Sequence, residues 1–455
     1  MGLELSIEWL TLAMFGSLLV FLLAGLPLAF MTGGLGVIFL VLFGDFKMIH
    51  MLPSRIFPFM TNYQLSALPL FLFMAAILER AGLIDALFDV VYKVLGGLKG
   101  GLASAAIVAS TILAAMVGVV GATEVTMGMI ALPAMLKRKY NPELACGSIL
   151  AGGSLGILIP PSVMAILVAL VLGCSIGELF VGAVFPGLLL SLLYILYITA
   201  RCYMKPSYGP ALPPEERLSV REKLALVKRI IAPLSLVALV LGVIFTGAAT
   251  PVEAAGIGTF GALFVMGLSR RLTWNAIKDS ATMTLKYTVM VLWIIFGASI
   301  FVGFYIFEGG ADFVNNMLLG TGLPPYGILL VMMALLIVLG MFLDWVGIMF
   351  LALPIFAPIV NGLAWDGLFG LPGVAPGEVL IWFGVVYMVN MQMSFLSPPF
   401  GYALFYLKSV AGPSISMATI FRSAIPFLGL QAIALFFCVA FPEIVLWLPR
   451  LIYGQ

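Results

Sequence analysis

Apolar runs long enough to cross a lipid bilayer follow one another through most of this chain. The first covers residues 10–43 and is divided by Gly25, Leu26 and Pro27, which predicts two helices. Later runs cover residues 101–136, 145–173, 179–200, 231–247, 252–268, 284–306, 326–360, 379–407 and 416–448. One crossing takes about 20 apolar residues, and only 9% of the 455 residues are charged. The sequence therefore predicts an all-α polytopic membrane protein and excludes a soluble enzyme.

The few charged and metal-ligating residues exclude further classes of protein. The net charge is +2 and the longest basic run is the triplet at residues 137–139, so nothing indicates a nucleic-acid partner. His50 is the only histidine, and the four cysteines lie far apart. This composition offers no metal centre, no histidine proton relay and no zinc protease motif. We therefore expect neither an enzyme nor a cofactor other than a coupling ion.

The longest hydrophilic segment, residues 201–229, lies at the midpoint of the chain. Its basic residues are Arg201, Lys205, Arg217, Arg221, Lys223, Lys228 and Arg229. Positive charge there predicts a cytoplasmic loop between a first repeat, residues 1–200, and a second, residues 230–455; a plain linker is the alternative. Residues 361–378 contain no Lys or Arg and predict an external loop. The sequence does not assign residues 137–139 to either side of the membrane.

Two pairs of short strings match between the halves. TEVTMGMIALP at 123–133 aligns with DWVGIMFLALP at 344–354, and SLGILIPPS at 154–162 aligns with QMSFLSPPF at 392–400. Proline removes a backbone donor and crowds the preceding helical turn, so matching Pro-Pro pairs predict helices broken at equivalent places in two repeats. The expected broken segments lie near residues 101–136, 145–173, 326–360 and 379–407.

Broken helices inside a bilayer are candidate binding sites. A free backbone carbonyl or N–H group costs several kcal/mol in lipid unless it faces protein, water or an ion, and paired breaks in two halves are typical of transport sites. The carbonyls of an unwound turn and nearby hydroxyls supply the several oxygens that an alkali cation requires. The candidates are Ser154, Gly156, Ile159, Pro160, Ser394, Ser397 and Pro398. Simple proline kinks are the alternative.

Two further segments predict re-entrant hairpins with tips of small residues. Residues 57–78 are interrupted by a polar stretch that ends near Ser66, and residues 284–306 are interrupted at Phe296–Ser299. Small tips let backbone dipoles approach a bound anion, and Lys286 is the only base nearby. A kinked single helix is the alternative for both segments.

Three acidic residues lie inside apolar runs, where an ionisable side chain is a functional candidate. Asp344 aligns with Thr123 in the repeat, and both are expected at helix breaks. Asp344 is either a cation ligand there or a structural residue, in a salt bridge or as a helix cap. Glu124 is either a coupling residue or a helix cap. Glu253 follows Thr250 in a Thr-x-x-Glu pattern with Pro at the first helical position, which predicts a capping box.

Several longer motifs occur in a fixed order along the chain. GLPLAF at residues 25–30 precedes GGSLGILIPPS at 152–162, ATPVEAAG at 249–256, FLDWVGIMFLALPIFAPIV at 342–360 and NMQMSFLSPPFGYALFYLK at 390–408. Together they resemble the large, DctM-like membrane subunit of tripartite ATP-independent periplasmic (TRAP) transporters, over essentially the whole chain. The resemblance implies an elevator-type fold of the ion transporter superfamily. Such a fold has two inverted-topology repeats, a scaffold, and a transport domain built from two re-entrant hairpins and two broken helices.

The resemblance also implies a function and partners. It implies sodium-coupled import of a small organic anion, a carboxylate or a sulfonate, across the bacterial inner membrane. It further implies a DctQ-like small membrane subunit of about four helices and a DctP-like periplasmic binding protein, with lipid around the chain. A P-loop of the GxxxxGK[ST] form is absent from the sequence. One alternative is a sodium/anion symporter of the same fold that works without a binding protein. The other is a membrane enzyme or a scaffold protein.

By the same resemblance, sodium and substrate sites fall on particular residues. The sodium positions at the broken helices are Gly156, Ile159 and Pro160 in the first half and Ser394, Ser397 and Pro398 in the second, with Ser154 beside them. Thr123 and Asp344 occupy the turns that face these breaks, and the hairpin tips fall near Ser66 and Ser299. Many family members have a Ser- and Gly-rich stretch where this chain has Val117–Gly121. A first-half sodium site therefore relies more on carbonyls and on Thr123.

Overall fold

A computed structural model describes residues 5–44, 46–118, 120–213, 222–223, 226 and 231–454. These residues form helices and turns, with no β-strand among them. The helices of the first half are α1 (Ile7–Leu23), α2 (Leu28–Phe43), α3 (Met51–Met60), α4 (Ala67–Arg80), α5 (Leu83–Leu95), α6 (Gly101–Val117), α7 (Val120–Lys137), α8 (Pro142–Ser154), α9 (Val163–Leu172) and α10 (Ile176–Met204). Those of the second half are α12 (Ile231–Phe245), α13 (Pro251–Leu268), α14 (Trp274–Phe307), α15 (Gly310–Leu319), α16 (Pro325–Gly340), α17 (Trp345–Asn361), α18 (Val379–Leu396), α19 (Tyr402–Val410), α20 (Met417–Ala440) and α21 (Glu443–Tyr453). Much of the loop predicted at 201–229 lies outside the described residues.

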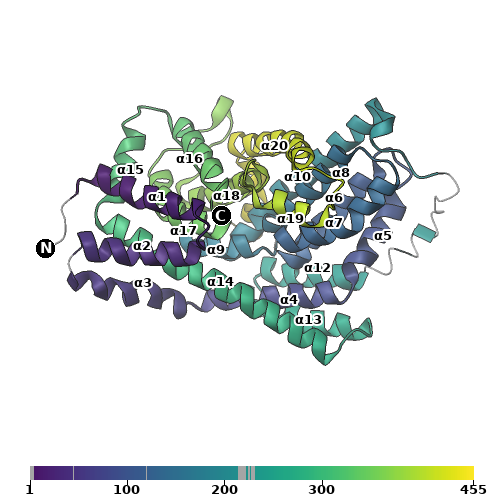
Figure 1. The fold of residues 1–455 in the computed structure, drawn as a ribbon, viewed down its shortest axis with the longest axis horizontal. Helices are drawn as coiled ribbons and strands as arrows, with labels where there is room; N and C mark the ends of the chain where they lie inside the picture. Colours follow the sequence, from purple (N-terminus) through teal and green to yellow (C-terminus); the bar gives the residue numbers. More distant parts are fainter. Residues whose placement is uncertain are drawn as a thin grey trace.

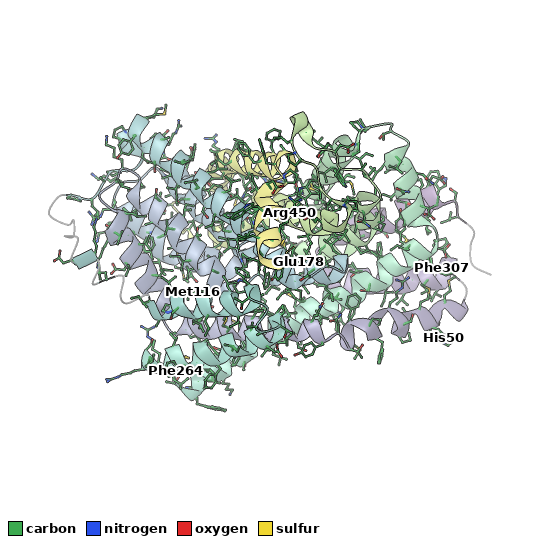
Figure 2. All side chains as sticks on the ribbon, turned by 180° about the vertical axis from the view of Figure 1, so that it is seen from behind. His50, Met116, Glu178, Phe264, Phe307 and Arg450 are labelled. Atoms are coloured by element: carbon green, nitrogen blue, oxygen red, sulfur yellow. The ribbon has the colours of Figure 1, made fainter. Side chains whose placement is uncertain are left out.

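Several helices are long and apolar enough to span a membrane. Among the described residues, five single helices are long and apolar enough, and a sixth span is possible if α3 and α4, which are joined by a bend, are counted as one. Large apolar side chains such as Phe264 and Phe307 are exposed on the surface, whereas Met116 is buried (Figure 2). An apolar surface of this kind suits lipid rather than water. The predicted all-α, polytopic class is confirmed at this level.

The two re-entrant hairpins predicted from the sequence are not where we expected them. Residues 284–306 lie within α14, which runs unbroken for 34 residues, so the hairpin predicted there is wrong. Across residues 57–78 the chain bends by 58° between α3 and α4 and does not turn back. The side chain of Asn62 accepts a hydrogen bond from the backbone N–H of Gln64 at this bend. The kinked-helix alternative therefore describes this segment better.

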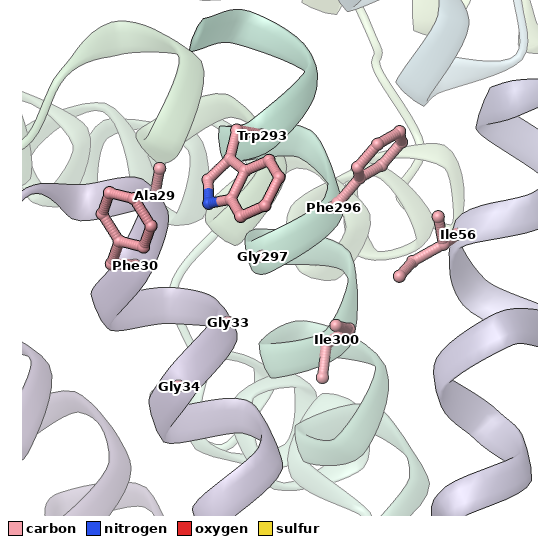
Figure 3. Close-up of a pocket in the computed structure, with 9 residues that line it drawn as sticks. All are labelled: Ala29, Phe30, Gly33, Gly34, Ile56, Trp293, Phe296, Gly297 and Ile300. Atoms are coloured by element: carbon pink, nitrogen blue, oxygen red, sulfur yellow. The ribbon is translucent and has the colours of Figure 1, made fainter. Parts of the chain in front are cut away.

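Small residues near 296–299 serve helix packing instead of a turn (Figure 3). A Cβ atom on Gly297 of α14 would lie 2.5 Å from Oγ1 of Thr32 and 2.7 Å from the carbonyl oxygen of Ala29, both in α2. Beside this contact lies an apolar groove of about 450 Å³, whose walls include Phe30 and Trp293. Glycine is thus required for the close approach of α2 and α14.

Helices from distant parts of the chain pack side by side. α2 packs along α14, and α13 packs along α4. α8 packs against α6, α7 and α20, while α18 packs against α16, α17 and α10. In addition, α7 contacts α19 and α17 contacts α9. Figure 1 shows α1–α3 at one end of the molecule and α5–α8 at the other, with α14 reaching from α2 to α4.

One side of the molecule carries the start of the central hydrophilic segment, and we call it the central-segment side. The backbone N–H of Gly100 donates to the carbonyl of Gly209 over 2.8 Å, and that of Asn141 donates to the carbonyl of Tyr208 over 2.9 Å. The start of α6, the end of α7 and the start of α8 therefore lie together on this side. Lys137 ends α7 and residues 138–139 follow it, so this basic triplet, whose side the sequence left open, lies here too.

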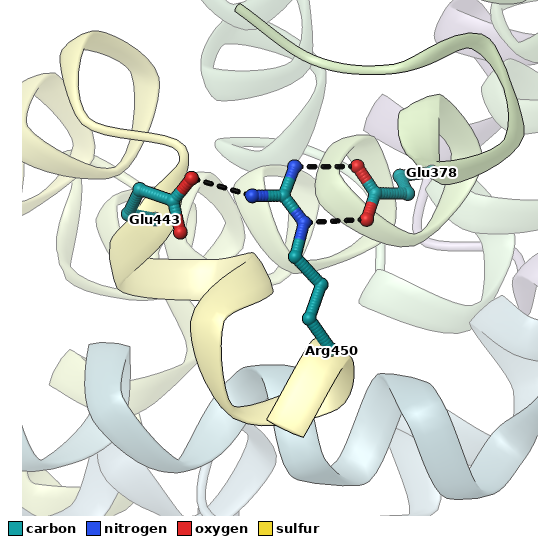
Figure 4. A network of polar contacts seen from close by, with 3 residues as sticks. All are labelled: Glu378, Glu443 and Arg450. Atoms are coloured by element: carbon teal, nitrogen blue, oxygen red, sulfur yellow. Dashed lines mark hydrogen bonds and ion pairs between the residues drawn. The ribbon is translucent and has the colours of Figure 1, made fainter. Parts of the chain in front are cut away.

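The opposite side, which we call the far side, carries the starts of α16 and α18. The hydroxyl of Tyr326 in α16 donates to the carbonyl of Asp366 over 2.8 Å. Arg450 of α21 donates two hydrogen bonds to Glu378 before α18, at 2.6 and 2.7 Å, and one to Glu443 at 2.5 Å (Figure 4). This network fixes α21 to the start of α18. The α6–α7 and α16–α17 pairs thus open toward opposite sides.

α10 and α20 run in opposite directions. Near the end of α10, the ring of Tyr197 meets that of Phe427, in the first half of α20, edge to face with centroids 5.4 Å apart. Near the start of α10, a Cβ atom on Gly182 would lie 3.2 Å from the carbonyl oxygen of Val445 in α21, which directly follows α20. The end of α20 therefore lies by the start of α10.

Candidate functional site

The first Pro-Pro pair lies in a break between two short helices. α8 ends at Ser154, a single 3₁₀ turn covers Leu155–Ile157, and α9 begins only at Val163. The hydroxyl of Ser162 donates to the carbonyl of Ile157 over 2.5 Å and accepts from the backbone N–H of Ala165. The Pro160–Pro161 peptide bond is cis. The break is buried, so backbone polar groups at this level face protein and not solvent.

The second Pro-Pro pair lies in an equivalent break. α18 ends at Leu396 and α19 begins at Tyr402, and the Pro398–Pro399 peptide bond is also cis. The hydroxyl of Ser397 donates to the carbonyl of Met393 over 2.7 Å. That of Ser394 donates to the carbonyl of Leu336 in α16 over 3.3 Å. Both serine hydroxyl oxygens retain lone pairs that are free to accept or to bind a cation.

The turn between α6 and α7 packs onto the first break. Gly118 ends α6 with φ of +63°, a left-handed conformation that favours glycine. A Cβ atom there would lie 2.9 Å from the carbonyl oxygen of Pro161. On α7, a Cβ atom on Gly121 would lie 3.1 Å from the ring of Tyr406 in α19. The α6–α7 pair therefore touches the broken helices of both halves.

The turn between α16 and α17 packs in the same way onto the second half. A Cβ atom on Gly340, the last residue of α16, would lie 2.2 Å from Cβ of Ser394. Asp344 caps α17, and its carboxylate accepts a hydrogen bond from the backbone N–H of Val346 over 3.2 Å. Asp344 is thus a helix cap, which is one of the roles predicted for it.

Thr123 does not lie at a break, contrary to our expectation. It is buried within the first turns of α7, and the chain leaves the helix earlier, at Gly118. The Ala-Leu-Pro match aligns Thr123 with Asp344, but α7 begins several residues further upstream of the shared motif than α17 does. The two aligned strings therefore differ by a few residues in where their helices begin.

Glu124 is the most unusual polar residue of the site. It is fully buried, and neither carboxylate oxygen has a hydrogen-bond partner among the described residues. Its side chain lies against α8, where a Cβ atom on Gly153 would come within 2.0 Å of Cγ of Glu124. The hydroxyl of Ser110, also without a partner among the described residues, lies against the neighbouring Gly152. A buried carboxylate is costly unless a cation or hydrogen bonds compensate it.

Further buried polar atoms lie on α18 and α20. The amide of Gln431 donates to Oγ of Ser154 over 3.4 Å, while its carbonyl oxygen has no partner among the described residues. Both amide atoms of Gln392 and Oδ1 of Asn390 are likewise without one. Buried polar groups in native proteins are usually paired. Their concentration near the two breaks distinguishes this region from the apolar core around it.

The predicted site residues fall into two groups. Seven of them lie in the two breaks or at the helix ends that border them: Ser154, Gly156, Ile159 and Pro160 in the first half, and Ser394, Ser397 and Pro398 in the second. Ser299 lies within the unbroken helix α14, so its assignment as a hairpin tip is wrong, whereas Ser66 lies at the bend between α3 and α4 and its role stays a prediction. Ser66 is exposed just before α4, and Ser299 lies within α14, where its hydroxyl donates to the carbonyl of Ile295.

Comparison with known proteins identifies the family. A family model described as "Tripartite ATP-independent periplasmic transporter, DctM component" matches residues 15–444. The chain belongs to this family. It is 32% identical to a C4-dicarboxylate TRAP transporter large permease protein of Pseudomonas aeruginosa, over 88% of this chain and 90% of that protein. It is 28% identical to a sialic acid TRAP transporter large permease protein of Vibrio cholerae, over 95% and 97%.

Other similarities extend this picture of a DctM-family permease. An ectoine/5-hydroxyectoine TRAP transporter large permease protein of Ruegeria pomeroyi is 27% identical, over 97% of this chain and 99% of that protein. The fold is similar to that of the YdaH transporter of Alcanivorax borkumensis, with a TM-score of 0.63 at 13% identity, over 96% of this chain and 99% of that chain. The chain is thus a transporter permease subunit with several membrane-spanning helices.

Proposed function

We propose that this permease imports a small organic anion, a carboxylate or a sulfonate, coupled to sodium by an elevator mechanism. The observation that carries the proposal is the pair of buried helix breaks, each closed by the turn of a helix pair. The α6–α7 turn lies on the break at Pro160–Pro161, and the end of α16 lies against Ser394. Such paired breaks present backbone carbonyls and helix ends to ions and anions within a membrane.

An inverted repeat is supported by the direction of the helices. α10 and α20 run antiparallel, and the α6–α7 and α16–α17 pairs open toward opposite sides. We propose that α6–α7 and α16–α17 are the two re-entrant hairpins and that α8–α9 and α18–α19 are the two broken helices. These helices, with α10 and α20, form the transport domain, and α1–α5 with α12–α15 form the scaffold along which it moves.

Sodium coupling is supported by the charge of the site. Glu124 and Asp344 bring two carboxylates near the breaks, and Lys and Arg are absent from the described residues of both breaks. An organic anion entering this region is repelled until cations neutralise the acids. Sodium binds carbonyl, hydroxyl and carboxylate oxygens. We propose that one ion binds beside Glu124 and Ser110, which lie against neighbouring glycines of α8, and that another binds beside Asp344 at the start of α17. We propose that sodium binding prepares the site for the anion.

Partners and location follow from the family. We propose that the chain works with a small membrane subunit of about four helices and with a periplasmic binding protein that delivers the anion. A relative from Oleidesulfovibrio alaskensis named as an isethionate TRAP transporter permease protein DctMQ is 27% identical and extends well beyond this chain, which covers 65% of it. The positive-inside rule puts the basic central segment in the cytoplasm of a bacterial inner membrane, so the far side faces the periplasm.

Reconstituted uptake tests this function. The cognate binding protein is first screened by thermal shift against C4-dicarboxylates, sialic acid, ectoine and isethionate, and the ligand that stabilises it is used as radiolabelled substrate. We expect the complete complex to accumulate that ligand only with an inward sodium gradient, and Ser397→Ala to abolish this accumulation. Ser409→Ala is the matched control, because Ser409 also donates to a carbonyl within its own helix but is exposed. Normal sodium-dependent uptake by Ser397→Ala would overturn the site assignment.

A further inference from the structure

A cavity lies between the proposed scaffold and transport domain. Leu170 and Val171 at the end of α9 line it, and α10, which begins next to α21 on the far side, follows them directly, so the cavity lies on that side. It has a volume of about 320 Å³ and is walled by α3 and α14 on one side and by α9 and α17 on the other. The ring of Phe59 in α3 meets that of Phe350 in α17 edge to face, with centroids 5.7 Å apart. The volume falls within the range of about 300–1,000 Å³ that is usual for small-molecule sites. Both groups of helices therefore contribute to one pocket.

Arg55 of α3 is the charged residue that lines this cavity. Its side chain extends toward α14, where a Cβ atom on Gly303 would lie 2.8 Å from Nε of Arg55. A larger residue than glycine at position 303 would push the guanidinium group away. The glycine thus provides the space in which Arg55 lies at the wall of the cavity.

The guanidinium group of Arg55 has no hydrogen bond or ion pair with any other part of the chain that the structure describes. The other far-side arginine, Arg450, is fully engaged by Glu378 and Glu443. Lys47 also precedes α3, but its side chain lies outside the described part. Arg55 is therefore a free cation on a side of the molecule that is otherwise poor in positive charge.

Ser299, which the sequence placed at a hairpin tip, also lines this cavity. Its hydroxyl proton is donated to the carbonyl of Ile295 over 2.6 Å, so it does not supply a donor to an anion. The donors come from Arg55, whose planar fork of N–H groups matches the two oxygens of a carboxylate or sulfonate. The remaining walls, such as Val302 and Phe350, are apolar and suit a small hydrocarbon body.

We propose that Arg55 binds the carboxylate or sulfonate group of the transported anion at a second, outer site, before the anion reaches the helix breaks. This inference rests on the proposed function, because it takes the far side as the periplasmic side and an organic anion as the substrate. The outer site holds the anion by one arginine, and the helix breaks then receive it together with sodium. Arg55 is accordingly a residue for capture and selection of anions, and sodium does not bind there.

Uptake kinetics of the complete complex test the role of Arg55 in capture. The substrate is the ligand that the cognate binding protein was found to bind. We expect Arg55→Gln to raise the KM for this ligand about tenfold, equivalent to about 1.4 kcal/mol, with an unchanged maximal rate and an unchanged sodium dependence. Arg55→Lys retains the charge without the fork and gives an intermediate KM. Lys278→Gln at the other end of α14 is the control and leaves KM unchanged.

A KM equal to that of the wild type in Arg55→Gln would overturn the outer site and leave sodium-coupled uptake intact. Conversely, a complex without sodium-driven uptake would refute the proposed function, and the outer site is then judged by binding alone. For that measurement, purified complex in nanodiscs is treated with phenylglyoxal, and modification of Arg55 is read by peptide mass spectrometry. We expect 20 mM succinate or methanesulfonate to slow the modification of Arg55 several-fold at constant ionic strength, and that of Arg422 not at all.

The same labelling distinguishes a substrate anion from a lipid headgroup. In nanodiscs of phosphatidylcholine alone, protection of Arg55 by added succinate or methanesulfonate supports the outer site. Addition of phosphatidylglycerol to the nanodiscs without free anion is the second arm. If phosphatidylglycerol protects Arg55 and the two organic anions do not, the residue is a lipid anchor and the proposal is wrong.

Discussion

Replacement of Glu124 by Gln tests whether a buried, unpaired carboxylate is kept for a cation. Neither oxygen of Glu124 has a partner among the described residues, and an ionised carboxylate held in this way costs several kcal/mol. Gln keeps the shape and removes the charge, but leaves a buried amide that costs about 1–3 kcal/mol. We therefore expect Glu124→Gln to be about 2–3 kcal/mol more stable than the wild type in the absence of sodium.

Thermal unfolding of the purified subunit in sodium chloride and in choline chloride measures this effect. A change of 2–3 kcal/mol corresponds to a rise of about 2–3 °C in Tm for a chain of this length. Sodium at about ten times its dissociation constant stabilises the wild type by about 1.4 kcal/mol, and this increment should be lost in Glu124→Gln. Lower stability of the variant in choline, together with an intact sodium increment, would refute the reasoning.

Glu253→Gln is the matched control for this experiment. Glu253 is exposed and completes the capping box of α13, with Oε2 2.8 Å from the backbone nitrogen of Thr250. Loss of one capping interaction costs on the order of 1 kcal/mol. The control should therefore lower Tm slightly in both salts and leave the sodium increment unchanged.

Three further substitutions test separate parts of the account: the α6–α7 turn, the carboxylate of Asp344 and the scaffold helix α13. Gly118→Ala should reduce sodium-dependent uptake at least tenfold, because the added Cβ meets the carbonyl of Pro161. Gly25→Ala is the control: it introduces the same left-handed strain of about 1–2 kcal/mol but has open space around it, so it should retain uptake. Asp344→Asn should keep the cap on α17, so its free energy of unfolding should stay within about 0.5 kcal/mol of the wild-type value. The same variant should lose sodium-dependent uptake, and uptake equal to that of the wild type would contradict the proposed role of Asp344. Thr250→Ala should destabilise the protein by about 1 kcal/mol in a melting experiment, and a changed sodium affinity would show that α13 influences the site.

The positions of the helix breaks were accessible from the sequence because proline acts locally. Pro160–Pro161 and Pro398–Pro399 cannot donate backbone hydrogen bonds, and α8 and α18 end just before them. The capping box at Thr250 and Glu253 is local in the same sense and is confirmed by both of its hydrogen bonds. Such features depend on a few neighbouring residues and not on the tertiary fold.

The hairpins were misplaced because glycine has two uses that look the same in a sequence. At Gly297 it allows α2 to approach α14, within a continuous helix. At Gly118 it adopts a positive φ and ends α6. A run of small residues does not reveal which use applies, because that depends on the helix packed against it. The chain therefore leaves its helix at Gly118 and not at residues 296–299.

Glu124 and Arg55 show what the sequence could not provide. The acid lies in an apolar run and was recognised as a candidate, but its lack of a partner depends on α8, where Gly153 contacts it. Arg55 follows the first two predicted helices, and nothing in the neighbouring sequence marks it as part of a site. Only the fold brings it to a cavity beside α9 and α17. Both cases depend on contacts between segments far apart in the chain.

Parallel measurement of ligand and sodium uptake in proteoliposomes tests sodium-coupled import most directly. Complexes of the large and small subunits, supplied with the loaded binding protein, are given an inward gradient of sodium or of choline, and the uptake of radiolabelled ligand and of ²²Na is measured in the same vesicles. We predict accumulation of the ligand only with the sodium gradient, with ²²Na entering in a fixed ratio to it. Equal accumulation in choline, or ligand uptake without entry of ²²Na, would contradict sodium-coupled import through the paired helix breaks.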